Sequence, residues 1–223
     1  MDDTLIAEDL LLLLLDDESG KLQGTSFIEI ALGGALLLEL STRGAVALTD
    51  KQTFRQQKVL AIDVPLLPPL LADALADIDD KERTAISVIS RLGRHRKPVL
   101  LERLEARGIL RSKNDKVVGL FPRTRWPAED SRHEDEVRRK IRQALIAQHP
   151  GDERTGALLS LLSAMGIASK VIEIDGISKR DLNKRAKVIS EGTWASEAVR
   201  DAVAASQAAI LAAVSASVAA SSS

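Results

Sequence analysis

Apolar residues recur at helical spacing along most of the chain, and this pattern predicts a mainly α-helical fold. Glycine, proline or a short polar turn closes each apolar stretch, as is usual at helix ends. We expect a helical bundle around a buried central helix, with residues 1–223 forming one domain. Helices are expected at residues 6–15, 26–42, 70–76, 80–93, 98–108, 153–165, 179–191 and 195–220, with a further helix capped at Ser131.

Two short stretches have the composition of β-strands and predict one or two short β-hairpins. In the first, residues 45–48 follow Gly44 and pair with residues 59–64. In the second, residues 109–111 and 117–121 flank a polar turn at 113–116. Lysine, asparagine and aspartate in such a turn are typical of hairpins.

Three helix starts carry recognisable signals. Asp79 or Asp80 is the expected cap of the helix that ends at Gly93. Ser131 and Glu134 have the spacing of a capping box. Pro98 is expected to be the first residue of its helix, where its missing N–H is not needed.

The composition narrows the chemistry of the protein. The chain has no cysteine, which excludes disulfides, thiolate metal sites and cysteine nucleophiles. His95, His133 and His149 are far apart in sequence, and each is expected at the surface. The paired aspartates match turn and cap chemistry better than catalytic carboxylates. We therefore expect no enzymatic activity, no cofactor and no metal.

Apolar segments of the chain do not predict a membrane span. The six leucines at residues 10–15 are too few to cross a bilayer and have acidic residues on both sides. Residues 202–220 are nearly uncharged, but their alanine and serine content favours a buried helix. We expect a cytoplasmic protein.

The net charge of −1 conceals a strong asymmetry. Residues 1–90 carry 7 basic and 16 acidic side chains, a balance of −9. Residues 91–142 carry 16 basic and 8 acidic side chains, a balance of +8. Such a basic segment indicates an anionic partner.

A basic loop lies inside this segment, just before the helix expected at Pro98. Arg91, Arg94, Arg96 and Lys97 supply its cations. The unpaired N–H groups of a helix N-terminus attract anions, and arginine binds phosphate through two hydrogen bonds. The loop is therefore a candidate phosphate site, with a solvated basic loop as the alternative.

The second hairpin carries an apolar run among basic residues. Val117, Val118, Leu120 and Phe121 form this run, with Lys113, Lys116, Arg123 and Arg125 around them. An apolar tip among cations suits an anionic bilayer, where each nearby cation contributes about 1 kcal/mol. The alternatives are packing on the core and an oligomer edge.

Many short matches, in the same order, connect the chain to a known family. The matching positions are residues 5–17, Thr25, Ser26 and Phe27, residues 34–44 and 100–110, the second hairpin up to Pro127, residues 154–164, and Lys184 to Lys187. In these positions the chain resembles the Golgi phosphoprotein 3 family of peripheral membrane proteins.

The resemblance implies a helical fold with an exposed hairpin that serves membrane insertion or self-association. Eukaryotic members recognise phosphatidylinositol 4-phosphate and act in Golgi trafficking. Two of their headgroup-binding arginines align with Arg94 and Lys97 of this chain. The resemblance thus implies a peripheral protein whose partner is an anionic phospholipid membrane surface, with a homo-oligomer formed through the hairpin.

The chain also departs from the family pattern. A third family arginine aligns with Gly33, and the family's binding tryptophan falls near Gly24, where there is none. The basic N-terminal tail of eukaryotic members has no counterpart, and the composition is that of a bacterial-type member. By this pattern, half of the family's headgroup pocket is absent from the chain.

Two other functions fit parts of the sequence. A helix followed by an Arg-Gly pair and a hairpin is the outline of a winged-helix nucleic-acid-binding unit. The slightly acidic chain and the lack of a clear recognition helix make nucleic acid the less favoured partner. The other function is that of an oligomeric structural protein with the hairpin as its contact.

Overall fold

The computed structural model describes residues 4–16, 19–22, 27–49, 58–79, 83–115 and 123–190. The mainly α-helical fold predicted from the sequence is confirmed. Its helices are α1 (Ile6–Leu14), α2 (Ile28–Thr42), α3 (Pro69–Asp79), α4 (Ala85–Gly93), α5 (Arg96–Ala106), α6 (Arg132–Ala147), α7 (Glu153–Ala164), α8 (Ala168–Val171) and α9 (Lys179–Ile189).

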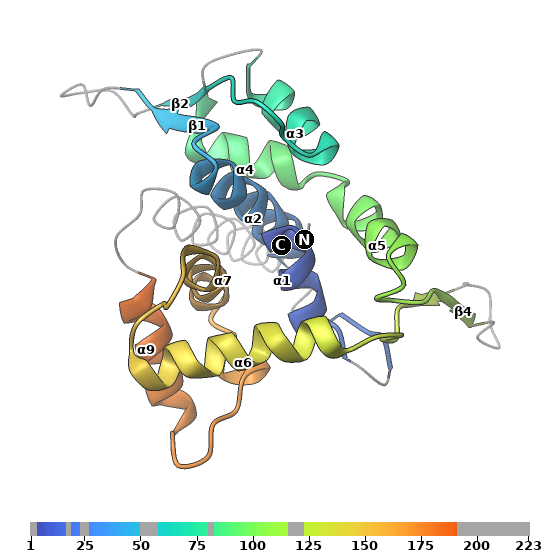
Figure 1. Ribbon diagram of the computed structural model, residues 1–223, viewed down its shortest axis with the longest axis vertical. Helices are drawn as coiled ribbons and strands as arrows, with labels where there is room; N and C mark the ends of the chain where they lie inside the picture. Colours follow the sequence, from blue (N-terminus) through green and yellow to red (C-terminus); the bar gives the residue numbers. More distant parts are fainter. Residues whose placement is uncertain are drawn as a thin grey trace, which may run out of the picture.

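Helices α1 and α2 form the buried centre of the fold (Figure 1). Every residue of α1 is buried, because α2, α5, α6 and α7 all pack against it. Its leucines therefore make a core contact on every side, as expected of a helix that is apolar all round. The predicted bundle around a central helix is confirmed for the described residues. That residues 1–223 form one domain stays a prediction, and the helix expected at 195–220 lies outside the described residues.

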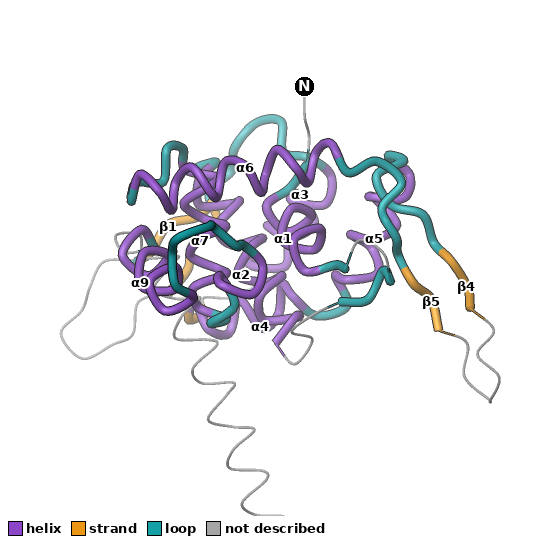
Figure 2. The backbone as a smooth tube through the Cα atoms, turned by 90° about the horizontal axis from the view of Figure 1, so that it is seen from below, coloured by secondary structure: helices purple, strands orange, loops and turns teal. Residues whose placement is uncertain are grey.

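Two small antiparallel sheets accompany the helices. Strands β1 (Val46–Leu48), β2 (Lys58–Ala61) and β3 (Arg83–Thr84) form the first sheet in that order. The predicted pairing of β1 with β2 is confirmed, with Val46 opposite Ala61. Strands β4 (Lys113–Asp115) and β5 (Arg123–Arg125) form the second, which projects from the helical body (Figure 2).

The second hairpin is present but lies further along the chain than predicted. Lys113 pairs with Arg125, so the residues expected to form the turn at 113–116 begin a strand instead. Residues 109–111 also pair, but with residues 127–129 and not with residues 117–121: Leu110 forms an antiparallel bridge with Ala128, and the Glu129 N–H donates to the Ile109 carbonyl. The side chains of Ile109 and Leu110 are buried. The apolar pattern thus located a pairing segment but not its partner.

The three predicted helix starts are wrong in detail. Asp79 is the last residue of α3, and Thr84 caps α4 by accepting a hydrogen bond from the Ser87 N–H. The Ser131 side chain makes no capping bond. Helix α5 begins two residues before Pro98, which occupies its third position. Proline is tolerated there because the first-turn N–H groups lack partners within the helix.

Helices α2 and α4 cross with their backbones in close contact, at two glycines that have no side chain. A Cβ atom on Gly33 would lie 1.9 Å from the carbonyl oxygen of Ile89. A Cβ atom on Gly93 would lie 1.7 Å from the carbonyl oxygen of Glu29. The two backbones therefore pack directly on each other. This contact positions α4, the helix that precedes the basic residues Arg94 to Lys97 in the chain.

Candidate functional site

The predicted basic loop is a tight junction between α4 and α5. Arg94 follows Gly93 as the C-cap residue of α4, and His95 turns the chain with a positive φ of 59°. Arg96 and Lys97 then form the first turn of α5, not the loop before it. The side chain of His95, the N-cap residue, makes no capping hydrogen bond, and the N-terminus of α5 carries the partial positive charge of a helix start.

Two of the four predicted site residues, Arg91 and Arg96, approach a carboxylate of α3. The Arg96 Nη2 atom donates to Asp77 Oδ2 of α3 at 2.6 Å. Arg91 approaches the other oxygen of Asp77 at 3.7 Å. Asp77 thus neutralises part of the charge on this side of the junction. Arg94 and Lys97 form no ion pair with any carboxylate of the described residues, so their charge is available to a ligand.

Lys97 lies on a small basic pocket that the sequence did not reveal. This pocket has a volume of about 170 Å³. Three cations line it, namely Lys21, Lys97 and Arg125, together with Trp126. The other lining residues are Gly20, Leu22, Leu101 and Thr124. No carboxylate is present among these lining residues, so the pocket has the electrostatics of an anion site.

Three segments far apart in sequence converge to build the basic pocket. The chain between α1 and α2 meets the exit of β5 where the Trp126 N–H donates to the Gly20 carbonyl at 3.2 Å. Gly20 has a φ of 59°, and a Cβ atom there would lie 2.4 Å from the Trp126 nitrogen. Only glycine meets both conditions. Lys21 is thereby brought beside Lys97 and Arg125, neighbours that no local pattern could indicate.

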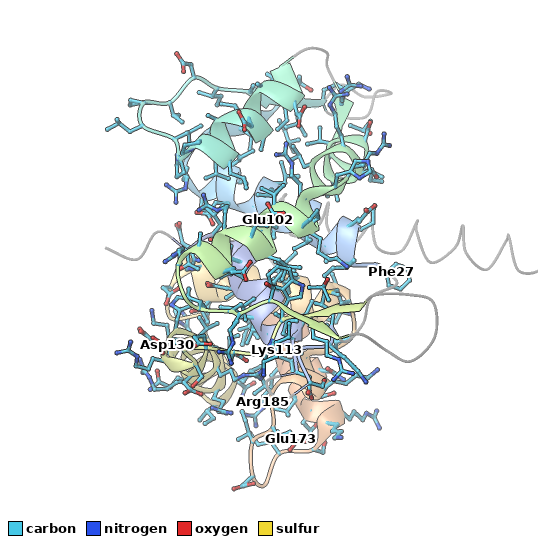
Figure 3. The ribbon with its side chains drawn as sticks, turned by 90° about the vertical axis from the view of Figure 1, so that its right-hand side faces the viewer. Phe27, Glu102, Lys113, Asp130, Glu173 and Arg185 are labelled. Atoms are coloured by element: carbon cyan, nitrogen blue, oxygen red, sulfur yellow. The ribbon has the colours of Figure 1, made fainter. Side chains whose placement is uncertain are left out.

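The hairpin is anchored to the same helix as Lys97. The hydroxyl and the N–H of Ser112 both donate to Glu105 Oε1 of α5, at 2.5 and 2.9 Å. These two hydrogen bonds lower the pKa of Glu105. Figure 3 shows β4 and β5 extending toward the side on which Phe27 projects. Val117, Val118, Leu120 and Phe121, the predicted membrane-contacting residues, lie outside the described residues.

Three buried carboxylates join helices of the core. Glu8 of α1 accepts from Arg103 Nε of α5 at 2.9 Å. Asp9 accepts from Arg154 Nε of α7 at 2.8 Å. Glu39 of α2 accepts from the Ile6 N–H at 2.7 Å. We call Glu8, Asp9 and Glu39 the buried carboxylate cluster; it fixes α5, and with it Lys97, against the core.

Part of the charge asymmetry is explained by ion pairs between the acidic residues 1–90 and the basic residues 91–142. Glu8 pairs with Arg103 and also approaches Arg107 at 3.6 Å. Asp77 pairs with Arg96 in the same way. These ion pairs join the acidic residues 1–90 to the basic residues 91–142. Part of the excess positive charge of residues 91–142 therefore stabilises the fold by pairing with carboxylates of residues 1–90.

His133 was expected at the surface, and this prediction is wrong. Its side chain is only 19% exposed, and its Nε2 atom lies 2.7 Å from Oδ1 of the fully buried Asp9. The two residues are separated by 124 positions in sequence, so no local signal could have revealed the contact. His95 and His149 are exposed, as expected. A cavity of about 190 Å³ lies beside His133, with Lys140, Asp152 and Arg154 among its lining residues.

Position 33, occupied by Gly33, has no room for a ligand-binding arginine. It is buried at the crossing of α2 with α4, with the Ile89 carbonyl 1.9 Å from its ideal Cβ position. Any side chain at this position would collide with α4 before reaching solvent. The resemblance aligned a headgroup arginine with Gly33, but the structure gives that position a packing role in this chain.

The described ranges contain neither a metal-ion site nor a membrane-spanning helix. No group of histidine, aspartate and glutamate side chains in these ranges is arranged to hold a metal ion. The buried carboxylates are occupied by arginines and backbone N–H groups. No helix within the described ranges is both long and apolar enough to span a membrane. The basic pocket presents positive charge beside the indole ring of Trp126.

Comparison with known proteins identifies a family. The profile of the family Golgi phosphoprotein 3 (GPP34) matches residues 6–206, nearly the whole chain. A comparison with curated proteins finds no match. The matched range includes all three segments of the basic pocket and the α4–α5 junction.

Proposed function

The chain belongs to the Golgi phosphoprotein 3 family, and from this premise we propose that it is a non-enzymatic, peripheral membrane protein of the cytoplasm. It binds anionic, phosphoinositide-like lipid headgroups at the basic pocket and the adjacent Arg94. The observation that carries the proposal is the convergence of Lys21, Lys97 and Arg125 on one pocket, whose described lining residues include no carboxylate.

A phosphate group is the ligand that matches the pocket best. Lysine and arginine form their strongest hydrogen bonds with ionised oxygens, and a phosphate offers several such oxygens at once. The uncapped N-terminus of α5 adds partial positive charge beside Lys97. The Trp126 ring supplies an apolar wall, against which the non-ionic part of a headgroup packs.

A membrane is the best source of that phosphate because the pocket stands at the base of the hairpin. Strand β5 ends in Arg125, which lines the pocket, and β4 begins with Lys113 opposite it. A lipid bound at the pocket therefore brings the hairpin to the bilayer surface. The apolar residues predicted at the hairpin, Val117 to Phe121, would then insert among the lipids, where each buried large side chain contributes about 1.5–3 kcal/mol.

Reversing the charge at the α4–α5 junction should abolish vesicle binding. We expect the double variant Arg94→Glu, Lys97→Glu to bind anionic vesicles at least roughly thirty-fold more weakly, since each cation contributes about 1 kcal/mol. Co-sedimentation with vesicles of phosphatidylcholine and an anionic phospholipid measures the loss. Circular dichroism checks that the variant is folded.

The matched control has the same change in net charge at another surface. Arg139→Glu, Lys140→Glu alters two cations of α6 that form ion pairs with the exposed Glu136. This control should retain most of the binding. Equal pelleting of wild type and the Arg94, Lys97 variant would show that the junction is not the binding site.

Trp126 offers a direct report on occupancy of the pocket. The chain has two tryptophans, so Trp194→Phe leaves Trp126 as the sole indole. Anionic vesicles should shift its emission to shorter wavelength, because a headgroup and lipid surface exclude water from the half-buried ring. Vesicles of phosphatidylcholine alone should leave the emission unchanged. A spectrum that does not respond to either would contradict a headgroup beside Trp126.

A further inference from the structure

One side of α5 faces both the basic pocket and the start of the hairpin. Lys97 and Leu101 line the pocket, and Glu105 follows at the same spacing of four residues. Residues four apart lie on the same side of an α-helix, so Glu105 continues this side toward the helix end. Glu105 does not line the pocket, so it acts on a bound ligand from a distance.

A carboxylate is an unexpected residue at this end of α5. The last turn of a helix carries partial negative charge, which favours cations there, and Glu105 is the next-to-last residue of α5. Its stabilisation comes from outside the helix, because the hydroxyl and the N–H of Ser112 both donate to its Oε1 atom. The hydroxyl contributes most to the lowered pKa of Glu105, and the N–H adds to it. The carboxylate is therefore held in its ionised form by the residue that precedes the hairpin.

Ser112 connects this carboxylate to a cation of the pocket. Ser112 immediately precedes β4, whose first residue, Lys113, pairs with Arg125 at the end of β5. The two hydrogen bonds to Glu105 fix the start of β4 against α5, and β4 in turn fixes the end of β5. Arg125 lines the pocket together with Lys97 of α5. The position of Arg125 relative to Lys97 therefore depends on Glu105.

We propose that Glu105 is a positioning residue of the headgroup site, which holds Arg125 in the basic pocket through Ser112 and the pairing of β4 with β5. This inference rests on the proposed function of the pocket. Because Glu105 is itself an anion, its charge alone opposes the binding of another anion nearby. Its removal would thus tighten binding if only charge mattered, and weaken binding if Arg125 loses its position. The direction of the change distinguishes the two effects.

Vesicle co-sedimentation of the full chain measures this direction. Glu105→Ala should bind anionic vesicles about five-fold more weakly than wild type, the effect of losing one cation near the surface, although its net charge is more positive. The matched control Glu102→Ala makes the same change of charge at an exposed position of α5 (Figure 3). It should bind as wild type does or slightly more tightly. Ser112→Ala, which changes no charge and removes only the hydroxyl bond, should weaken binding less than Glu105→Ala.

A double-mutant cycle separates positioning from a general loss of stability. In a chain that carries Arg125→Gln, the additional change Glu105→Ala should weaken binding no further, because the cation that Glu105 positions is already gone. A mere loss of stability would lower binding equally in both backgrounds. Additive losses would therefore show that Glu105 does not act through Arg125. Circular dichroism checks that each variant is folded.

Quenching of Trp126 fluorescence tests the same positioning without any lipid. In the Trp194→Phe chain, nearby cations concentrate the anion iodide at the indole, whereas neutral acrylamide reports only its exposure. The ratio of iodide to acrylamide quenching should fall in Glu105→Ala and not in Glu102→Ala.

Two results would overturn the inference: an unchanged quenching ratio in Glu105→Ala, or vesicle binding by that variant at or above the wild-type level. A wild type that binds no anionic vesicles would instead contradict the proposed function. The quenching ratio would still decide in that case whether Glu105 positions Arg125.

Discussion

Replacing Gly93 by alanine should lower the free energy of unfolding by about 3 kcal/mol or more, since overpacking a tight contact commonly costs 1–3 kcal/mol. The added Cβ would lie 1.7 Å from the Glu29 carbonyl oxygen, so α2 and α4 would have to separate. No side chain can rotate away to relieve this collision, because both partners are backbone. Urea unfolding followed by circular dichroism measures the change.

Gly156→Ala is the matched control for this experiment. Gly156 also lies inside a helix, α7, but its nearest neighbour is a Pro150 side-chain atom at 3.2 Å. Alanine is a better helix former than glycine by up to about 1 kcal/mol, which offsets a shift of a few tenths of an ångström. Its stability should stay close to that of wild type. Equal unfolding midpoints for Gly93→Ala and Gly156→Ala would refute the close crossing of α2 and α4.

Replacing Arg154 by methionine should destabilise the protein by about 3–5 kcal/mol, the usual effect of removing one partner of a buried ion pair. Arg154 donates to Asp9 and to the Thr4 carbonyl, and its Nη1 atom lies 3.6 Å from Glu39. Asp9 is fully buried, so without Arg154 its carboxylate keeps His133 as its one side-chain partner among the described residues. Urea unfolding at neutral pH provides the measurement.

Arg139→Met is the control for the loss of an arginine. Arg139 is on the outer face of α6, where it is 56% exposed and approaches Glu136 at 3.8 Å. Exposed pairs of this kind contribute little, so the change should stay within about 0.5 kcal/mol. If Arg154→Met were as mild as Arg139→Met, the buried carboxylate cluster would not be a determinant of the fold.

Much of the helical framework could be predicted because its signals are local. The leucine spacing in residues 6–15 predicts a helix that the structure places at Ile6–Leu14. Gly44 and Gly108 were expected to end their helices, and both have a positive φ, of 68° and 70°. In these cases a residue and its near neighbours decide the conformation, and the rest of the fold agrees with them.

The candidate site was only half predictable, because its geometry depends on distant segments. The sequence selected Lys97 from the local concentration of charge. It could not show that Lys21 and Arg125 join Lys97 in one pocket, or that Arg96 instead pairs with Asp77. Charge counts along a chain do not distinguish cations that face a ligand from those that neutralise a buried carboxylate.

Trp126 supplies the pocket with an indole ring, although it lies far in sequence from the position at which the family has its binding tryptophan. The resemblance led us to look for a tryptophan near Gly24, where the sequence has none. The pocket nevertheless contains an indole, because the exit of the second hairpin places Trp126 against Gly20. Only a three-dimensional arrangement brings these two positions together, and the headgroup proposal rests on that arrangement.

The most direct test of the central claim is co-sedimentation of the wild-type chain with two sets of vesicles that differ only in an anionic phospholipid. We predict saturable binding to the anionic set, little binding to pure phosphatidylcholine, and progressive release as salt screens the cations of the basic pocket. Equal binding to both sets, or binding to neither set while duplex DNA is retained, would contradict the claim that this chain recognises anionic lipid headgroups.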